Sequence, residues 1–151
     1  HPDGELFRSL PGAGTLLAAR MLGSLGDRRD RYPHVLAVQA LAGTAPVTRQ
    51  SGKRTVVCFR RACDKSFRAA VGQFAFCSLQ YCAWASEYYR AKRAAGHGHR
   101  AALRELGHIW LRIIYAVAST GDLRRSSFPA IPTSPPDRHR LLAGRRKDPP
   151  V

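Results

Sequence analysis

Ser51 lies in a stretch of residues whose types could carry out phosphate chemistry. It stands between two cations, Arg49 and Lys53, and Gly52 follows it directly. A serine hydroxyl among cations can attack or hold a phosphate, because the cations neutralise the anion and a glycine lets the backbone approach closely. Ser-Gly turns are also common on protein surfaces, so a solvated basic turn is the alternative interpretation.

Positive charge is concentrated around this serine and is in excess over the whole chain. Residues 44–61 contain no acid, and the chain of 151 residues carries 25 Lys and Arg against 10 Asp and Glu, a formal net charge of +15. Such an excess attracts polyanions, of which nucleic acid is the commonest for a basic domain, with an anionic membrane surface as the rival partner. We expect DNA rather than a membrane. The candidate DNA contacts near Ser51 are Arg49, Lys53, Arg54, Arg60 and Arg61.

A second phosphate-binding pattern lies near the start of the chain, where L-P-G-A-G leads into a helical pattern. Two glycines around a small residue allow a tight hairpin that exposes its amides at a helix N-terminus, where the partial positive charge suits a backbone phosphate. This is the helix-hairpin-helix pattern, and Gly12 and Gly14 are therefore candidate DNA contacts. The alternative is a simple turn between two helices.

Hydrophobic periodicity predicts a mainly α fold: a helix-hairpin-helix-like N-terminal part, a basic loop, a bundle of long helices and a disordered C-terminal tail. The loop covers residues 44–61, within which residues 55–59 are at most a short strand. Asp64 is placed to cap a long helix with one buried face. The expected helical segments are 10–26, 33–43, 64–82, a segment around 84–96, and 103–117.

The chain has the size of one compact domain with tails, and we expect a domain over residues 1–118. Residues 119–151 are rich in Pro and Arg and poor in apolar residues, so we expect them to be a disordered tail. No window offers about 18 uninterrupted apolar residues, and no signal peptide is evident. We expect a bacterial cytoplasmic, nucleoid-associated protein.

Three other groups of residues suggest chemistry less strongly. Four cysteines in a C-x4-C, x13, C-x4-C pattern resemble zinc ligands, but helical spacing makes the second pair diverge, so reduced buried thiols are favoured and no metal ligand is expected in this chain. His97 and His99 lie in a Gly-rich segment, which favours a polar interhelix loop over a metal site. Aromatic residues at helical spacing favour core packing over base stacking: Trp84, Tyr88, Tyr89 and Trp110.

Several blocks, in order, resemble the C-terminal transposase domain of the IS 110/116/902 insertion-sequence family. The resemblance covers about residues 5–117. Its most specific part is L-A-G-T-A-P-V-T-R-Q-S-G-K at residues 41–53. The other blocks are L-P-G-A-G with the helix after it, R-R-A-C at 60–63, W-A-S-E-Y-Y at 84–89, R-E-L-G at 104–107 and W-L-R-I-I-Y at 110–115.

The resemblance implies a site-specific recombinase guided by a bridging RNA. In that family an N-terminal RuvC-like domain binds magnesium through acidic residues, and the domain matched here supplies a serine nucleophile, which falls on Ser51. The implied reaction is transesterification, in which the serine attacks a DNA phosphorus. Arg49, Lys53 and Arg54 are the nearest candidates to neutralise the phosphate. Two recombining duplexes imply a homo-oligomer of the full-length protein.

The chain also departs from the family pattern. It holds no matching set of carboxylates, and its Pro/Arg-rich end is not part of the resemblance. We therefore expect a fragment, such as a truncated or frameshifted gene copy, that is inactive alone and needs the missing RuvC-like domain and its magnesium. The alternative function is a non-catalytic nucleic-acid-binding module or an inactive transposase remnant.

Overall fold

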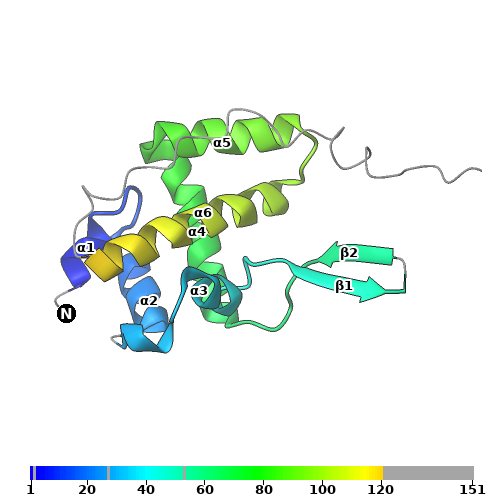
Figure 1. Cartoon of the computed structure of the whole chain (residues 1–151). Coiled ribbons are helices and arrows are strands. Elements are labelled where there is room, and N and C mark those ends of the chain that lie inside the picture. Colours follow the sequence, from blue (N-terminus) through cyan, green and yellow to red (C-terminus); the bar gives the residue numbers. More distant parts are fainter. Residues whose placement is uncertain (2, 27, 53, 121–151) are drawn as a thin grey trace, which may run out of the picture.

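The computed structural model describes residues 1, 3–26, 28–52 and 54–120 (Figure 1). Six α-helices, one 3-10 turn and one β-hairpin make up this part of the chain, which confirms the mainly α fold. The predicted tail lies outside the described residues, except for its first two, which end the last helix. The elements are α1 Gly4–Arg8, α2 Thr15–Leu25, η1 Arg29–Arg31, α3 Val35–Leu41, β1 Val47–Ser51, β2 Arg54–Cys58, α4 Lys65–Tyr81, α5 Ala83–Ala94 and α6 His99–Thr120.

Helix α4 runs through the middle of the body and contacts α2, α5 and α6 (Figure 1). Its start is the predicted one, because the Asp64 carboxylate accepts a hydrogen bond from the Phe67 amide at 2.9 Å and so satisfies an amide that lacks a helical partner. The predicted buried face is confirmed for Phe67, Val71, Phe74, Ala75 and Ser78, and Ala70 is buried with them. Cys82, which was also predicted on this face, is only half-buried. The helix ends where Cys82 becomes extended.

Trp110 of α6 is the largest side chain of the core, which confirms its predicted packing role. Its ring lies 5.0 Å from that of Phe74 and 4.8 Å from that of Trp84, between centroids. The indole N–H donates to the Ser78 hydroxyl at 2.9 Å, and this hydroxyl donates to the Ala75 carbonyl at 2.8 Å. The indole N–H of Trp110 and the Ser78 hydroxyl are thus both hydrogen-bonded, so burying this ring does not leave an unpaired donor.

The segment between α1 and α2 packs directly on α4. Gly12 has φ +84°, and a Cβ at this position would lie 2.9 Å from the backbone carbon of Cys77. Only glycine tolerates both the left-handed backbone and this close approach. Gly14, by contrast, is exposed, has φ −65°, and would meet nothing within 4 Å. The two glycines therefore have different structural roles.

Residues 47–58 form a β-hairpin where the sequence predicted a loop with at most one short strand. The strands are antiparallel, with Val47 opposite Cys58 and Ser51 opposite Arg54. Strand β1 was missed because four of its five residues are exposed and it lacks the alternation of apolar and polar residues that reveals a half-buried strand. Gly52, with φ +56°, allows the tight connection. The hairpin projects from the helical body (Figure 1).

The base of the hairpin is attached to the helices through Phe59. The Arg68 guanidinium lies 4.5 Å from the centre of the Phe59 ring, and that of Arg104 lies 4.8 Å from it. Arg68 also donates to the Arg60 carbonyl at 2.7 Å. An isolated two-stranded hairpin is marginal in water, so contacts of this kind with α4 and α6 are needed to orient it.

None of the helices in the described part of the chain combines the length and apolar character that crossing a bilayer requires.

Candidate nucleic-acid interface

Ser51 is exposed at the outer end of the hairpin and shares one face with two arginines. Because side chains alternate along a strand, Arg49 and Ser51 of β1 point to the same side. Arg54 of β2 is paired directly with Ser51, so it lies on that side too. The Cβ atoms of such a pair are about 4.5–5.5 Å apart. All three residues are exposed, so the register places the serine on the same open face as the two arginines.

The remaining basic candidates are not placed beside Ser51. Lys53 lies outside the described residues. Arg60 and Arg61 follow β2 at the base, where Arg61 is exposed and Arg60 is half-buried. The structure thus brings Arg49 and Arg54 to the serine and separates the other two from it by the length of the hairpin.

The two glycines of the N-terminal L-P-G-A-G pattern also lie in different surroundings. Gly14 is the N-cap of α2, no side chain caps this helix, and the residue is exposed. Its position suits a phosphate at a helix N-terminus. Gly12 instead packs on the α4 backbone. A DNA contact by either glycine remains a prediction.

A cavity of about 430 Å³ lies at the base of the hairpin. Its walls come from four parts of the chain: the connection before β1, the end of β2, α5 and α6. The side chains that matter chemically are Thr44, Arg60, Tyr88, Arg104, Glu105 and His108. Sequence reasoning did not single out Glu105 and His108. The signal available was their spacing of three residues on one helix, which places two polar side chains side by side.

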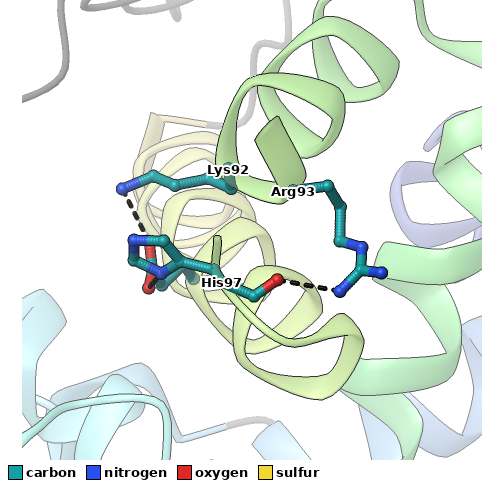
Figure 2. A network of polar contacts seen from close by, with 4 residues as sticks. Lys92, Arg93 and His97 are labelled. Atoms are coloured by element: carbon teal, nitrogen blue, oxygen red, sulfur yellow. Dashed lines mark hydrogen bonds and ion pairs between the residues drawn. The ribbon is translucent and has the colours of Figure 1, made fainter. Parts of the chain in front are cut away.

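Glu105 is held in a small polar network (Figure 2). Its carboxylate lies 2.7 Å from the Lys92 ammonium and 2.8 Å from His97 Nδ1. Arg93 donates to the His97 carbonyl at 2.8 Å, which holds the loop between α5 and α6. Burial works to raise the pKa of Glu105, but Lys92 and His97 outweigh it and hold that pKa below its usual range. The carboxylate is therefore ionised and its charge is balanced.

His108 lies beside the Thr44 hydroxyl. This hydroxyl lies 3.2 Å from the Gln39 carbonyl oxygen and 3.3 Å from His108 Nδ1. Backbone amides of Thr44 and Ala45 also donate to this carbonyl, so the hydroxyl has two alternative acceptors, and the tautomer of His108 depends on which one it uses. Burial, with a contribution from Arg112, lowers the pKa of His108 below 6.5. The ring is thus neutral at pH 7.

This pKa shift predicts a dependence of stability on pH. Because the pKa of His108 is lower in the folded chain than the ordinary 6.5, the unfolded chain binds more protons around and below that pH. The free energy of unfolding should fall as pH drops from about 7.5 through 6.5, until the folded pKa is reached. Urea unfolding at a series of pH values measures this. His108→Gln should flatten the slope in that window, and an unchanged slope would contradict the assignment.

The other candidate groups have simple structural positions. All four cysteines are free and half-buried, and among the described residues no group of three or more His, Cys, Asp or Glu is placed to hold a metal ion. His97 and Gly98 connect α5 to α6 as predicted, and His99 begins α6. Tyr89 contacts His99 Nδ1 through its hydroxyl at 2.6 Å. Tyr88 and Tyr89 are both half-buried.

Comparisons with known proteins match this chain to transposases. Residues 4–90 match the transposase IS116/IS110/IS902 family. The "Mini-circle putative transposase for IS117" of Streptomyces coelicolor is 40% identical over 106 residues, which is 70% of this chain and 26% of that protein. The "Insertion element IS110 uncharacterized 43.6 kDa protein" of the same organism is 28% identical over 131 residues, 86% of this chain and 32% of that protein.

A mycobacterial relative matches similarly. The "Insertion element IS900 uncharacterized 42 kDa protein" of Mycobacterium paratuberculosis is 29% identical over 118 residues, 78% of this chain and 30% of that protein. The chain thus spans about a quarter to a third of the length of these relatives. The family match covers more than half of the chain and includes the whole hairpin with Ser51, so this chain belongs to the transposase IS116/IS110/IS902 family.

Proposed function

We propose that this chain is the serine-bearing, DNA-binding part of an insertion-sequence transposase and that Ser51 is its nucleophile. The observation that supports this most directly is the hairpin register, which places Arg49 and Arg54 on the same exposed face as Ser51. A nucleophile that attacks a phosphodiester needs both access and neutralisation of the anionic oxygens. The tip of a projecting hairpin provides the first and the two guanidinium groups provide the second.

The proposed reaction is a transesterification at phosphorus. Ser51 Oγ forms a bond to the phosphorus, and the bond from phosphorus to one bridging oxygen of the DNA strand breaks. The leaving strand takes up a proton, and the serine hydroxyl loses one. A hydroxyl of the incoming strand later attacks the phosphoserine and releases Ser51, so the number of phosphodiester bonds is conserved. The covalent intermediate divides one difficult exchange into two steps.

The proton from Ser51 must go to a group outside the hairpin. Residues 47–58 contain no Asp, Glu or His, and guanidinium groups do not accept protons at neutral pH. We propose that the missing part of the protein supplies the acceptor, in a RuvC-like domain whose carboxylates hold magnesium. Arg49 and Arg54 then act in this chain by binding and orienting the phosphate.

The partners follow from the same proposal. The DNA is held through its phosphates by the hairpin arginines and by the N-terminus of α2 at Gly14. Such phosphate contacts carry no information about the DNA sequence. Sequence choice would come from a guide RNA. The full-length protein would act as a homo-oligomer on chromosomal DNA in the bacterial cytoplasm, because two duplexes must be joined.

Covalent trapping tests the nucleophile. In a chimera, this chain would replace the matching segment of the IS117 relative. The chimera would be incubated with the DNA substrate of that relative, nicked so that the strand needed to displace Ser51 dissociates after the first step. We expect a nucleotide adduct on the tryptic peptide that contains Ser51, identified by mass spectrometry. An adduct on another residue, or free broken ends with no adduct, would contradict the proposal.

The second candidate function is a binding module without chemistry. The observation in its favour is that residues 47–58 contain no carboxylate or histidine that could take the serine proton. The trapping experiment separates the two candidates, because a binding module retains DNA affinity in the chimera and yields no adduct.

Salt dependence tests the DNA contacts in this chain alone. We expect the logarithm of the binding constant for duplex DNA to fall linearly with the logarithm of salt concentration, with a slope near −0.9 per phosphate contact. The double variant Arg49→Gln, Arg54→Gln should make this slope less steep by about 1.8, since two contacts are lost. Arg90→Gln is the matched control, because Arg90 is an exposed cation of α5 far from the hairpin in the sequence. A change of about 0.9 for the control, the same as the double variant shows per lost cation, would mean that charge alone, and not the hairpin, binds DNA.

A further inference from the structure

The cavity at the base of the hairpin has the chemistry of a nucleotide-binding pocket. Its volume of about 430 Å³ falls within the range of about 300–1,000 Å³ typical of small-ligand sites. Its lining combines two guanidinium groups, Arg60 and Arg104, with an aromatic ring, Tyr88, and the apolar side chain of Ile109. Cations beside aromatic and apolar groups fit a ligand with an anionic end and a flat heterocyclic end.

Arg60 provides a separate indication that a ligand belongs here. Its Nε–H is buried and has no hydrogen-bond partner among the described residues. A buried unpaired donor costs about 1–3 kcal/mol, more for a charged group, so it is rare without a reason. The side chain lines the cavity. An anionic oxygen bound at this guanidinium, with a small shift of the side chain, would supply the missing acceptor.

Other residues that line the cavity offer hydrogen-bond groups that suit the edge of a base. The His108 ring is one of them, and its Nδ1 lies 3.3 Å from the Thr44 hydroxyl. The Glu105 carboxylate adds acceptor oxygens, and its charge is balanced by the Lys92 ammonium at 2.7 Å, which reduces its repulsion of a phosphate at the arginines. Burial raises the pKa of Tyr88, so its hydroxyl is protonated and can donate. Donors and acceptors thus lie together around one pocket.

The position of the cavity relates it to Ser51. The pair Val47–Cys58 lies at the base of the hairpin and the pair Ser51–Arg54 at its tip, four residues apart along β1. At about 3.3 Å per residue this separates the two sites by about 13 Å, which is close to four base-pair steps of about 3.4 Å measured along the axis of duplex DNA. A strand that runs along the hairpin from Ser51 would pass the mouth of the cavity.

The geometry points to a pocket that takes up one unstacked nucleotide of the DNA strand bound along the hairpin, with its phosphate at Arg60 and Arg104 and its base between Tyr88 and His108. This inference rests on the proposed function for the choice of DNA as the strand. Extruding a base costs a few kcal/mol in a duplex and least in single-stranded DNA. The pocket would therefore favour single-stranded or distorted DNA near the exchanged phosphate.

An abasic scan tests the pocket with the chain alone. Fluorescence anisotropy would measure the binding of a labelled single-stranded DNA of about 12 nucleotides, within the range of ~4–16 that one domain covers. Each base in turn would be replaced by an abasic unit. We expect one position at which the replacement weakens binding about 5- to 150-fold, the size of the loss seen when one stacked base loses its aromatic partner. Removing other bases should change binding less than about 2-fold.

Variants connect that position to the cavity. In Tyr88→Leu the abasic effect should shrink to less than about 2-fold, because the stacking partner is gone. Arg104→Gln should weaken binding of every oligonucleotide. Arg90→Gln removes an exposed cation that lies about 200° around α5 from Tyr88, so it controls for charge. Thermal unfolding checks that each variant folds. If Tyr88→Leu does not fold, the comparison of Arg104→Gln with Arg90→Gln carries the test, and equal losses for the two overturn the inference.

The other outcomes of these measurements distinguish the DNA pocket from an RNA pocket and from the proposed role of Ser51. No sensitive position in the scan, or an abasic effect that persists in Tyr88→Leu, overturns the pocket. An RNA of the same sequence that binds more tightly, with the same base dependence, overturns the assignment to DNA. Ser51→Ala should leave the scan unchanged. The pocket and the nucleophile can thus fail independently.

Discussion

Ser51→Ala should abolish DNA strand transfer by the IS117 chimera while leaving its DNA binding intact. The expected loss is on the order of 10⁴-fold or more, the size found when the nucleophile of a covalent mechanism is removed. The physical reason is that alanine has no oxygen to form the bond to phosphorus, whereas Arg49 and Arg54 still bind the phosphate. A plasmid recombination assay measures the activity, and anisotropy with duplex DNA measures the binding.

The opposite face of the hairpin provides a matched control. Thr55 also carries a hydroxyl and directly follows Arg54, but it is paired with Gln50 on the other side of the hairpin. Thr55→Ala should keep activity within about 3-fold, because losing one exposed side chain changes stability by only about 0.5 kcal/mol. If Ser51→Ala retains activity, the nucleophile is elsewhere. If both variants lose activity together, the hairpin has a structural role rather than a chemical one.

Gly12→Ala should destabilise the fold strongly. At φ +84° an alanine is strained by about 1–3 kcal/mol. Its Cβ would also lie 2.9 Å from the Cys77 backbone carbon and 3.0 Å from the Cys77 carbonyl oxygen. A helix backbone cannot move aside as a flexible side chain can, so overpacking adds about 1–3 kcal/mol. A total of about 2–6 kcal/mol is a large share of the 5–15 kcal/mol that holds a typical domain together.

Gly14→Ala is the comparison that gives this result its meaning. Gly14 has φ −65° and nothing within 4 Å of a built Cβ, so alanine fits, and the loss of a good N-cap residue costs about 1 kcal/mol or less. The midpoint temperature of thermal unfolding, Tm, should therefore fall by about 10 °C or more for Gly12→Ala and by only a few degrees for Gly14→Ala. Equal, small shifts would contradict the packing role of Gly12. Weaker DNA binding by Gly14→Ala at unchanged stability would support a phosphate contact at α2.

Local signals were enough to predict five of the six α-helices of the described residues, whereas α1 was not among the expected segments. Asp64 caps α4 because a carboxylate three residues before an amide can reach it whatever the rest of the fold does. The buried face of α4 follows from spacing along one helix, and the position of Trp110 follows from the same rule on α6. Ordered blocks of residues also pointed to the family, which the match over residues 4–90 confirms. The role of Ser51 stays a prediction.

The arrangement around Ser51 needed the tertiary structure. In the sequence, Arg49, Lys53 and Arg54 were equivalent neighbours of the serine. Strand pairing distinguishes them, because side chains alternate with a period of two and one step of register would move Arg54 to the other face. Strand β1 has no apolar pattern to reveal that register, so only the hydrogen-bonded partner defines it.

What the sequence by itself determined is therefore what depends on neighbours along the chain: the helices other than α1, their caps and buried faces, the excess of positive charge and the family. What only the tertiary structure decided is what depends on residues distant in sequence. The cavity joins Thr44, Tyr88 and His108, and the Gly12 contact joins two segments more than 60 residues apart. Such contacts form by packing between elements, and no local period of two or 3.6 residues encodes them.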